Sequence, residues 1–246
     1  RAITDFERAK TYYFSQQKNT KRRDQRAGLD YFATPEPLGF KMAEWLDLHA
    51  NSDALEPSAG HGAIARFLPG DTNNTIIEPS PELSAKAGIN AKGKVVTSTF
   101  ENHSLQNKYD GIVMNPPFGK GGKTATDHLG KAMRHTRDGG RIVALMPRGP
   151  EADRRLNDLL ESEAAGEFYR VAEIGLPKVT FERAGTQANA RLVVLDRQSN
   201  PDNAPNALGE REISADNIEE LFDQIEGLAM PGRFEPVKSM SGAEAE

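Results

Sequence analysis

The chain has 246 residues and a net charge of −5, with 37% hydrophobic and 27% charged residues and no cysteine. This length allows one large α/β domain or two small ones. Without cysteine there are no disulfides or thiolate metal sites, and the five histidines show no ligand spacing, so we expect no metal. No apolar run is long enough to cross a membrane and no signal-peptide pattern opens the chain, so we expect a cytoplasmic protein.

Charge is distributed unevenly along the chain. Residues 1–30 carry eight Lys or Arg against four Asp or Glu, whereas residues 198–246 carry three against eleven. A basic arm and an acidic tail on a nearly neutral core suggest that only one end faces a polyanion. The arm is equally compatible with a nucleic-acid contact and with a solvated leader. The first residue is Arg1 rather than Met, which is compatible with a piece of a longer protein.

Apolar segments predict alternating strands and helices. Strands are expected at 53–56, 75–78, 95–97, 111–114, 141–146, 168–174 and 190–195. Helices are expected at 35–48, 63–68, 81–87, 125–137, 151–163 and 216–228. Thr34 is the expected N-cap of the first helix, with Pro35 at its first position, and Gly139-Gly140 are expected to end the fourth. The alternation predicts an α/β fold with a mostly parallel, doubly wound sheet and an antiparallel hairpin at one edge.

The apolar run 111–114 stops at Asn115-Pro116-Pro117-Phe118, so the following loop starts at the carboxyl edge of the predicted sheet. The Asn115 side-chain carbonyl and the Pro116 carbonyl can both accept hydrogen bonds from one planar amino group. Phe118 offers a flat face to the ring that carries this amine. Taken alone, the tetrapeptide is equally compatible with a surface turn. Its residue types nevertheless favour a site that binds an exocyclic amine.

A glycine-rich loop, Pro57-Ser58-Ala59-Gly60-His61-Gly62, follows the first predicted strand. Its N–H groups allow a ligand to approach the backbone closely. With Ala65 and Glu78 it matches the dinucleotide fingerprint, so a nicotinamide enzyme is one alternative. Glu56 at the strand end opposes this alternative, because its negative charge suits a cation better than a pyrophosphate.

A second glycine-containing stretch, Gly122-Lys123-Thr124, imitates the end of a phosphate-binding loop. The glycine that such a loop requires five residues earlier is replaced by Pro117, so the pattern fails. Lys120 and Lys123 are interpreted instead as phosphate contacts or as solvated charge.

Glu56–Gly62 and the tetrapeptide together resemble methyltransferases that use S-adenosyl-L-methionine (AdoMet) to modify amino groups, specifically the N6-adenine DNA methyltransferases. The order, with Tyr31–Pro35 before the loop, is similar to their gamma arrangement, and Phe181–Arg197 is similar to their late hairpin. The resemblance implies a Rossmann-like class I methyltransferase domain at 31–197. A basic polar arm at 1–30 and an acidic helix and tail at 198–246 would flank it.

The resemblance implies a role for each matching residue. The catalytic residues are Asn115, Pro116, Pro117 and Phe118. The cofactor-binding residues are Tyr31, Thr34, Pro35, Glu56, Pro57, Ser58, Ala59, Gly60, Gly62, Glu78, Thr99, Phe100 and Asn115. Substrate-binding residues are Phe118, Lys120, Lys123 and Phe181. Thr99 departs from the family, which usually has an acid there for the cofactor's adenine, and Phe181 is equally compatible with core packing.

The expected reaction is transfer of a methyl group from AdoMet to N6 of an adenine in DNA, with the base flipped out of the duplex. Methyltransferases of RNA bases or protein glutamine use the same tetrapeptide and stay open as alternatives, as does an inactive AdoMet-binding module. No segment is suited to reading base edges in the major groove. We therefore expect either little sequence specificity or a specificity or helicase-type domain or subunit outside this chain.

Overall fold

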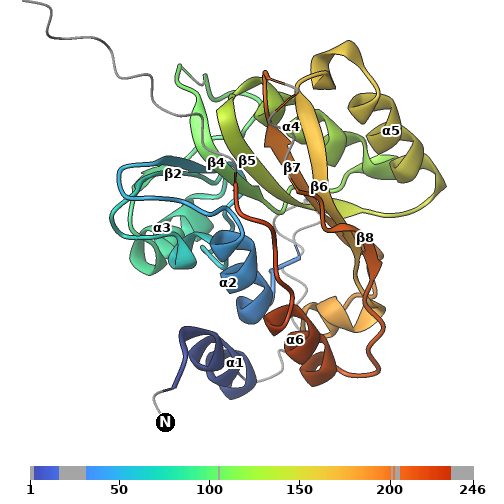
Figure 1. Cartoon of the computed structure of the whole chain (residues 1–246). Coiled ribbons are helices and arrows are strands. Elements are labelled where there is room, and N and C mark those ends of the chain that lie inside the picture. Colours follow the sequence, from blue (N-terminus) through green and yellow to red (C-terminus); the bar gives the residue numbers. More distant parts are fainter. Residues whose placement is uncertain (1–2, 17–31, 105, 201, 203–205, 234–246) are drawn as a thin grey trace, which may run out of the picture.

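Eight strands form one mixed sheet in the computed structural model, which describes residues 3–16, 32–104, 106–200, 202 and 206–233 (Figure 1). The strands are β1 Asp53–Glu56, β2 Asn73–Ile77, β3 Lys94–Val96, β4 Tyr109–Met114, β5 Thr136–Pro147, β6 Phe168–Gly175, β7 Ala190–Arg197 and β8 Gly209–Glu212. The α-helices are α1 Asp5–Ser15, α2 Glu36–Glu44, α3 Pro81–Asn90, α4 Lys123–Arg134, α5 Pro150–Leu160 and α6 Ile218–Glu226. Short 3₁₀ helices are η1 Ala65–Phe67, η2 Lys120–Gly122, η3 Glu163–Ala165 and η4 Lys178–Ala184.

The strand order is β3-β2-β1-β4-β5-β7-β6-β8, in which the first five strands are parallel. β7 is antiparallel to both β5 and β6, and β8 pairs in parallel with β6. Central strands are buried on both faces, as the apolar runs of β4 and β7 require. In Figure 1, α4 and α5 group on one side of the sheet and α1, α2 and α6 on the other. The predicted doubly wound α/β fold is thus confirmed.

The chain reverses its direction of winding between β1 and β4, and this point positions the site. β1 and β4 pair in parallel, with Leu55 opposite Ile112. The loops that follow Glu56 and Met114 therefore leave the sheet side by side at its carboxyl edge. Open α/β sheets bind their ligands at such a switch point.

The predicted helix at 63–68 is wrong, because only the 3₁₀ helix η1 forms there. The N–H groups of Phe67 and Leu68 bind carbonyls three residues back rather than four. Leu68 is extended (φ −63°, ψ 138°) because a residue before proline, here Pro69, is driven out of the helical region. The cofactor loop is therefore followed by one tight turn.

Both ends of α2 also differ from the prediction. Its N-cap is Pro35, which provides no side-chain hydrogen bond, and the helix ends at Glu44 instead of residue 48. Thr34 is not the N-cap, because its hydroxyl accepts a hydrogen bond from Asn115. A contact between distant segments has taken the place of local capping.

Gly139 and Gly140 were predicted to end a helix, but they lie inside β5. α4 ends at Arg134, and β5 begins two residues later. The register against β4 shifts in this region, and Gly139 has a φ of 77°. A Cβ on Gly140 would lie 2.8 Å from the Arg137 carbonyl oxygen. The glycines therefore allow an irregularity at the start of the strand.

One α-helix and one strand, α1 and β8, were not predicted. Thr4 and Glu7 form a capping box at the start of α1, and Phe6 and Tyr13 are buried. The Tyr13 ring packs edge-on against Phe222 of α6, with 5.0 Å between centroids. Both ends of the described chain therefore pack on one hydrophobic core. The basic cluster at 18–26 and the tail at 234–246 lie outside the described residues.

Arg141 and Asp196 form a fully buried ion pair that ties β5 to β7, with distances of 2.6 and 2.9 Å between their nitrogen and oxygen atoms. We predict that Arg141→Met lowers the free energy of unfolding by about 3–5 kcal/mol, because it leaves Asp196 buried without a counter-charge. Denaturant unfolding measures this loss. The exposed pair Arg154–Asp158 gives the control, Arg154→Met, which should cost about 0–1 kcal/mol. Equal losses in both variants would contradict the prediction.

Candidate functional site

Asn115 stands at the carboxyl end of β4 with its side-chain orientation fixed by two hydrogen bonds. Its Nδ2 donates to the Phe32 carbonyl oxygen at 2.8 Å and to the Thr34 hydroxyl at 3.0 Å. Both amide N–H groups are thus used, and no residue in the described part of the chain donates to Oδ1. A neutral amide held in this way presents a hydrogen-bond acceptor.

The backbone of Asn115 is held as well. The Ser58 hydroxyl of the cofactor loop donates to the Asn115 carbonyl oxygen at 3.2 Å. Asn115 therefore joins three segments, namely the end of β4, the loop after β1, and residues 32–34. The structure brings together the predicted residues Asn115, Ser58 and Thr34, whereas Tyr31 lies outside the described residues.

Three aromatic side chains, Phe32, Phe118 and Phe181, form what we call the aromatic cluster. The ring centroids of Phe32 and Phe118 are 6.2 Å apart at an interplanar angle of 60°, and Phe32 is also 6.2 Å from Phe181. Phe118 is 9% exposed and Phe181 only 1%. Of the two interpretations left open for Phe181, core packing describes its position, and its connection to Phe118 runs through Phe32.

Phe32 is a site residue that the sequence analysis missed. Its ring contacts both other members of the aromatic cluster, and its carbonyl oxygen orients Asn115. The one available signal was its place between Tyr31 and Thr34, inside the segment that resembles the family's first motif. Sequence spacing alone does not reveal a backbone carbonyl as an orienting group.

The glycine loop folds back on Glu78, the predicted ribose-binding acid. Oε2 of Glu78 accepts from the Gly60 N–H at 2.8 Å, and Oε1 accepts from the Ser80 N–H at 2.9 Å. Gly60 and Gly62 have φ values of 57° and 92°, which only glycine adopts readily. Glu78 thus shapes the loop. Each of its oxygens keeps a second lone pair that suits a hydroxyl donor.

Glu56 is a buried carboxylate without a counter-charge. It is 1% exposed, and its Oε2 has no hydrogen-bond partner in the described chain. Burial raises the pKa of Glu56 well above its usual value; the Ala65 backbone N–H opposes this shift and the charge of Glu78 adds to it. A buried carboxylate in this state fits a ligand that carries positive charge, such as AdoMet.

The remaining predicted residues lie at the border of the site. Lys120 is exposed on η2, and Lys123 forms an exposed ion pair with Asp127 at 2.6 Å. The Thr99 hydroxyl accepts from the Asn102 N–H at 3.2 Å. Phe100 is buried, and the Lys131 ammonium group lies 4.7 Å from the centroid of its ring. Lys131 also binds the carbonyl oxygens of residues 100, 101 and 103, which fixes this segment against α4.

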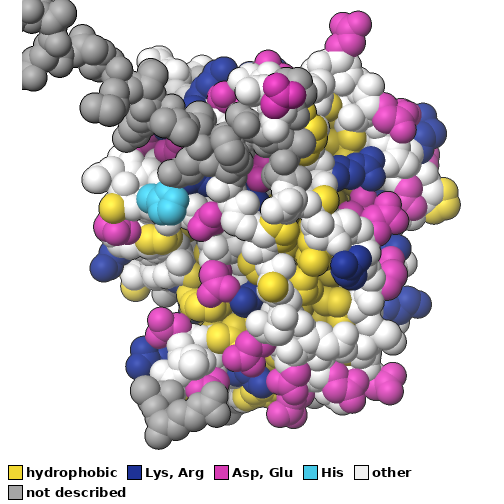
Figure 2. Space-filling model, in the orientation of Figure 1, with side chains coloured by type: hydrophobic (Ala, Val, Ile, Leu, Met, Phe, Trp, Pro, Cys, Tyr) yellow, Lys and Arg dark blue, Asp and Glu magenta, His cyan; other side chains and the backbone are white. Residues whose placement is uncertain are grey.

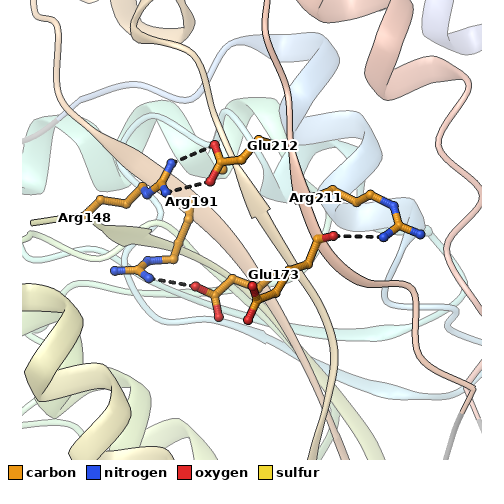
Figure 3. Close-up of a pocket in the computed structure, with 7 residues that line it drawn as sticks. Arg148, Glu173, Arg191, Arg211 and Glu212 are labelled. Carbon is orange, nitrogen blue, oxygen red and sulfur yellow. Dashed lines mark hydrogen bonds and ion pairs between the residues drawn. The ribbon is translucent and has the colours of Figure 1, made fainter.

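A cavity of about 190 Å³ opens beside β6 and β8, where it is lined by ion-paired side chains (Figure 3). Arg148 binds both carboxylate oxygens of Glu212, and Arg191 donates to Glu173 at 2.7 Å. None of the predicted site residues lines it. Three arginines and three glutamates balance one another in its lining, so it does not replace the carboxyl edge of β1 and β4 as the candidate site.

The described residues include no cluster suited to a metal ion and no membrane-spanning helix. No group of three or more His, Asp or Glu side chains among them is arranged to hold a metal ion. Within the same residues, no helix combines the length and apolar character needed to span a bilayer.

Residues 58–168, less than half of the chain, match the family model of the methyltransferase small domain. A segment of 105 residues is 31% identical to the type II methyltransferase M.AccI of Acinetobacter calcoaceticus. This match covers 36% of the chain and 18% of M.AccI, so the chain spans only a small part of that relative.

Solved structures share the fold. A Listeria monocytogenes protein assigned as a class I S-adenosylmethionine-dependent methyltransferase gives a TM-score of 0.64 at 14% identity, covering 90% of this chain and 77% of its own. A modification subunit assigned to a type I restriction enzyme of Vibrio vulnificus gives 0.58 at 18% identity, covering 87% and 54%. A protein assigned as an RNA methyltransferase of Pyrococcus horikoshii gives 0.59 at 15% identity, covering 78% and 98%.

At these identities the structural likeness establishes the fold and leaves the substrate open. Together with the family match, it supports a methyltransferase whose cofactor is AdoMet, as the sequence predicts. The residues around Glu56, Gly60 and Glu78 fit this cofactor, because they combine an unpaired buried carboxylate with a tight glycine loop.

We predict that AdoMet binding releases a proton from Glu56. The pKa of this carboxyl is raised in the free protein, and a cationic ligand stabilises its ionised form. Affinity should therefore fall as the pH falls below the raised pKa of Glu56 in the free protein, and should level off above that pKa. Calorimetry in buffers of different ionisation enthalpy measures the proton.

Glu56→Gln should weaken binding and remove the proton release, whereas the exposed control Glu219→Gln on α6 should change neither. The same proton release in Glu56→Gln and in the unmodified protein would rule out Glu56 as the group that titrates.

Proposed function

We propose that this protein transfers a methyl group from AdoMet to the exocyclic N6 amine of adenine in DNA. The fixed orientation of Asn115 carries the proposal, because its two donors are already used and its Oδ1 is left to accept from an amine. A site that needed a donor at this position would not occupy both N–H groups internally.

Two acceptors at one amine have a chemical consequence. The lone pair of the adenine amine is conjugated with its ring, so the amine is a poor nucleophile. When Asn115 Oδ1 and the Pro116 carbonyl each accept one N–H bond, the nitrogen is drawn toward a tetrahedral shape and its lone pair is directed away from the ring. AdoMet supplies an activated methyl group on a sulfonium: the amine nitrogen bonds to this carbon, the carbon–sulfur bond breaks to leave a neutral thioether, and the methylated nitrogen gives up one proton to water. Positioning of the amine by the protein is therefore the main contribution.

Phe118 provides the stacking face for the target base. Extracting a base from a duplex costs a few kcal/mol. Stacking on an aromatic ring contributes about 1–3 kcal/mol per base, which offsets much of this cost. The edge of Phe32 supports the Phe118 ring, and Phe181 supports Phe32. Phe181 thus acts on the base through its neighbours.

DNA is the proposed substrate because of the relatives. The sequence match is to a type II methyltransferase, and a modification subunit assigned to a type I restriction enzyme shares the fold. Lys120 is exposed two residues after the tetrapeptide, which supports its proposed contact with a phosphate. RNA bases and protein glutamine also present planar amines, so they are the substrates against which DNA must be compared.

We predict that Asn115→Ala lowers the rate of methyl transfer by about 100-fold or more, by analogy with the loss of a fixed hydrogen-bonding group elsewhere. AdoMet affinity should remain nearly unchanged, because the target amine is the proposed partner of Asn115. Transfer from labelled AdoMet to DNA, RNA and protein, beside calorimetry, measures both quantities.

The control is Asn107→Ala, which removes an exposed asparagine from a surface loop. The unmodified protein should form N6-methyladenine in DNA. If Asn115→Ala keeps substantial activity, the proposed role of Asn115 is wrong. If the label is found only in RNA or protein, the proposed substrate is wrong.

We propose that a domain or subunit outside this chain selects the DNA sequence to be methylated. Figure 2 shows acidic side chains gathered over α6, where Glu219, Glu220, Asp223 and Glu226 are exposed, and phosphates would repel this face. The inserts that remain are short, and M.AccI is several times longer than the segment it shares with this chain. We propose that an additional specificity or helicase-type domain or subunit completes the enzyme.

We predict that this chain alone methylates adenines with little preference for neighbouring bases, since phosphate contacts carry little sequence information. Methylated adenines on a long random duplex can be mapped at single-base resolution. A fixed motif of four or more base pairs, produced by the chain alone, would show that it contains its own reader.

A further inference from the structure

Arg183 of η4 joins two helices that lie outside the candidate site. Its Nη2 donates to Glu36 Oε2 of α2 at 2.6 Å, and its Nη1 donates to the Tyr13 carbonyl oxygen of α1 at 2.8 Å. The guanidinium also lies 3.8 Å from the centroid of the Tyr13 ring. A planar guanidinium suits such combined hydrogen bonding and stacking.

The groups that receive Arg183 are themselves fixed. Glu36 is 4% exposed and Tyr13 is 5% exposed. Burial raises the pKa of Tyr13 to about 12, and the charge of Arg183 opposes this shift. A second contact ties α1 to α6, namely Lys10 with Asp223 at 2.8 Å. α1 is thus docked, so that Arg183 binds a stationary surface.

The same η4 segment reaches the site from its other end. Phe181 precedes Arg183 by two residues, is 1% exposed and contacts Phe32. Phe32 in turn contacts Phe118 and orients Asn115 through its carbonyl oxygen. Each step from Arg183 to the acceptor at Asn115 is therefore a packing contact, a hydrogen bond or a short stretch of chain.

We propose that Arg183 is a positioning residue for methyl transfer. It fixes η4 to α1 and α2, and so holds the aromatic cluster in the arrangement that aligns the target amine with Asn115. This inference rests on the proposed function, since it concerns the target side of the same site. Through Arg183, α1 would help to hold the aromatic cluster in place, although it lies far from Asn115 in the sequence.

A positioning role and a merely structural role predict different kinetics. A merely structural role would lower AdoMet affinity together with the rate. A positioning role lowers kcat and leaves AdoMet affinity intact, because Glu56, Gly60 and Glu78 lie on other segments. The kinetic split between AdoMet affinity and kcat therefore decides between them.

The decisive variant is Arg183→Gln, with Arg154→Gln on the exposed face of α5 as its control for loss of one positive charge. Arg183→Gln should lower kcat about 10- to 100-fold, the range expected for misplacement of reacting groups by about 1 Å. Its AdoMet affinity should match that of the control, whereas its melting temperature should fall, because Glu36 is left buried without a counter-charge. Arg183→Lys should recover part of kcat, because it restores the charge without the planar fork.

An Arg183→Gln variant with the kcat of the control would overturn the proposal. So would a loss of kcat that is accompanied by an equal loss of AdoMet affinity. If Arg183→Gln does not fold, Arg183→Lys beside Glu36→Gln provides the same comparison.

Amide hydrogen exchange separates this proposal from the proposed function. In Arg183→Gln, peptides covering residues 178–186 and 32–36 should exchange faster than in the control, whatever substrate the enzyme takes. If the unmodified protein methylates no adenine but this exchange rises, the proposed function fails and the connection through Arg183 stands. Unchanged exchange in both peptides would overturn the connection itself.

Discussion

The site depends on the two hydrogen bonds donated by the Asn115 amide. They fix residues 32–34 against the end of β4, and they determine which atom of Asn115 faces an incoming group. Ser58 adds a contact from the loop after β1. Because β1 and β4 are neighbours in the sheet, these segments meet where the chain changes its direction of winding. The fold thus supplies the meeting point, and Asn115 turns it into a site with a defined acceptor.

A buried carboxyl group with an unsatisfied oxygen, Glu56, marks the cofactor side of the same site. Other buried charged groups of the described core have an ion-pair partner, as Arg141 has in Asp196, or, like Glu78, accept a backbone N–H bond on each oxygen. Glu56 is the exception, since one of its oxygens lacks a partner and its pKa is raised by burial. A carboxyl group that is buried without a partner is costly to ionise, so a protein keeps one where a ligand compensates its charge. The free protein therefore holds a place for positive charge beside a fixed acceptor for an amine.

The strands and the tetrapeptide could be predicted because their signals are local. Two prolines end β4, and its apolar residues mark a strand buried on both faces. The role of Thr34 could not be predicted, because its partner lies 81 residues away and long-range contacts leave no trace in local propensity. α1 could have been found: Thr4 and Glu7 have capping-box spacing, and the buried Phe6, Ala9 and Tyr13 follow a helical period, although charged neighbours obscure it. The burial of Phe181 depends on packing that only the fold reveals.

The most direct test concerns the Asn115 amide in the free protein. NMR of protein labelled with ¹⁵N at asparagine side chains, with Asn115 assigned from its Ala variant, reports how fast its two Nδ2 protons exchange with water. Because both protons are donated to Phe32 and Thr34, they should exchange much more slowly than those of exposed asparagines, before any ligand is added. Exchange as fast as that of an exposed amide would contradict the claim that the acceptor is fixed in advance.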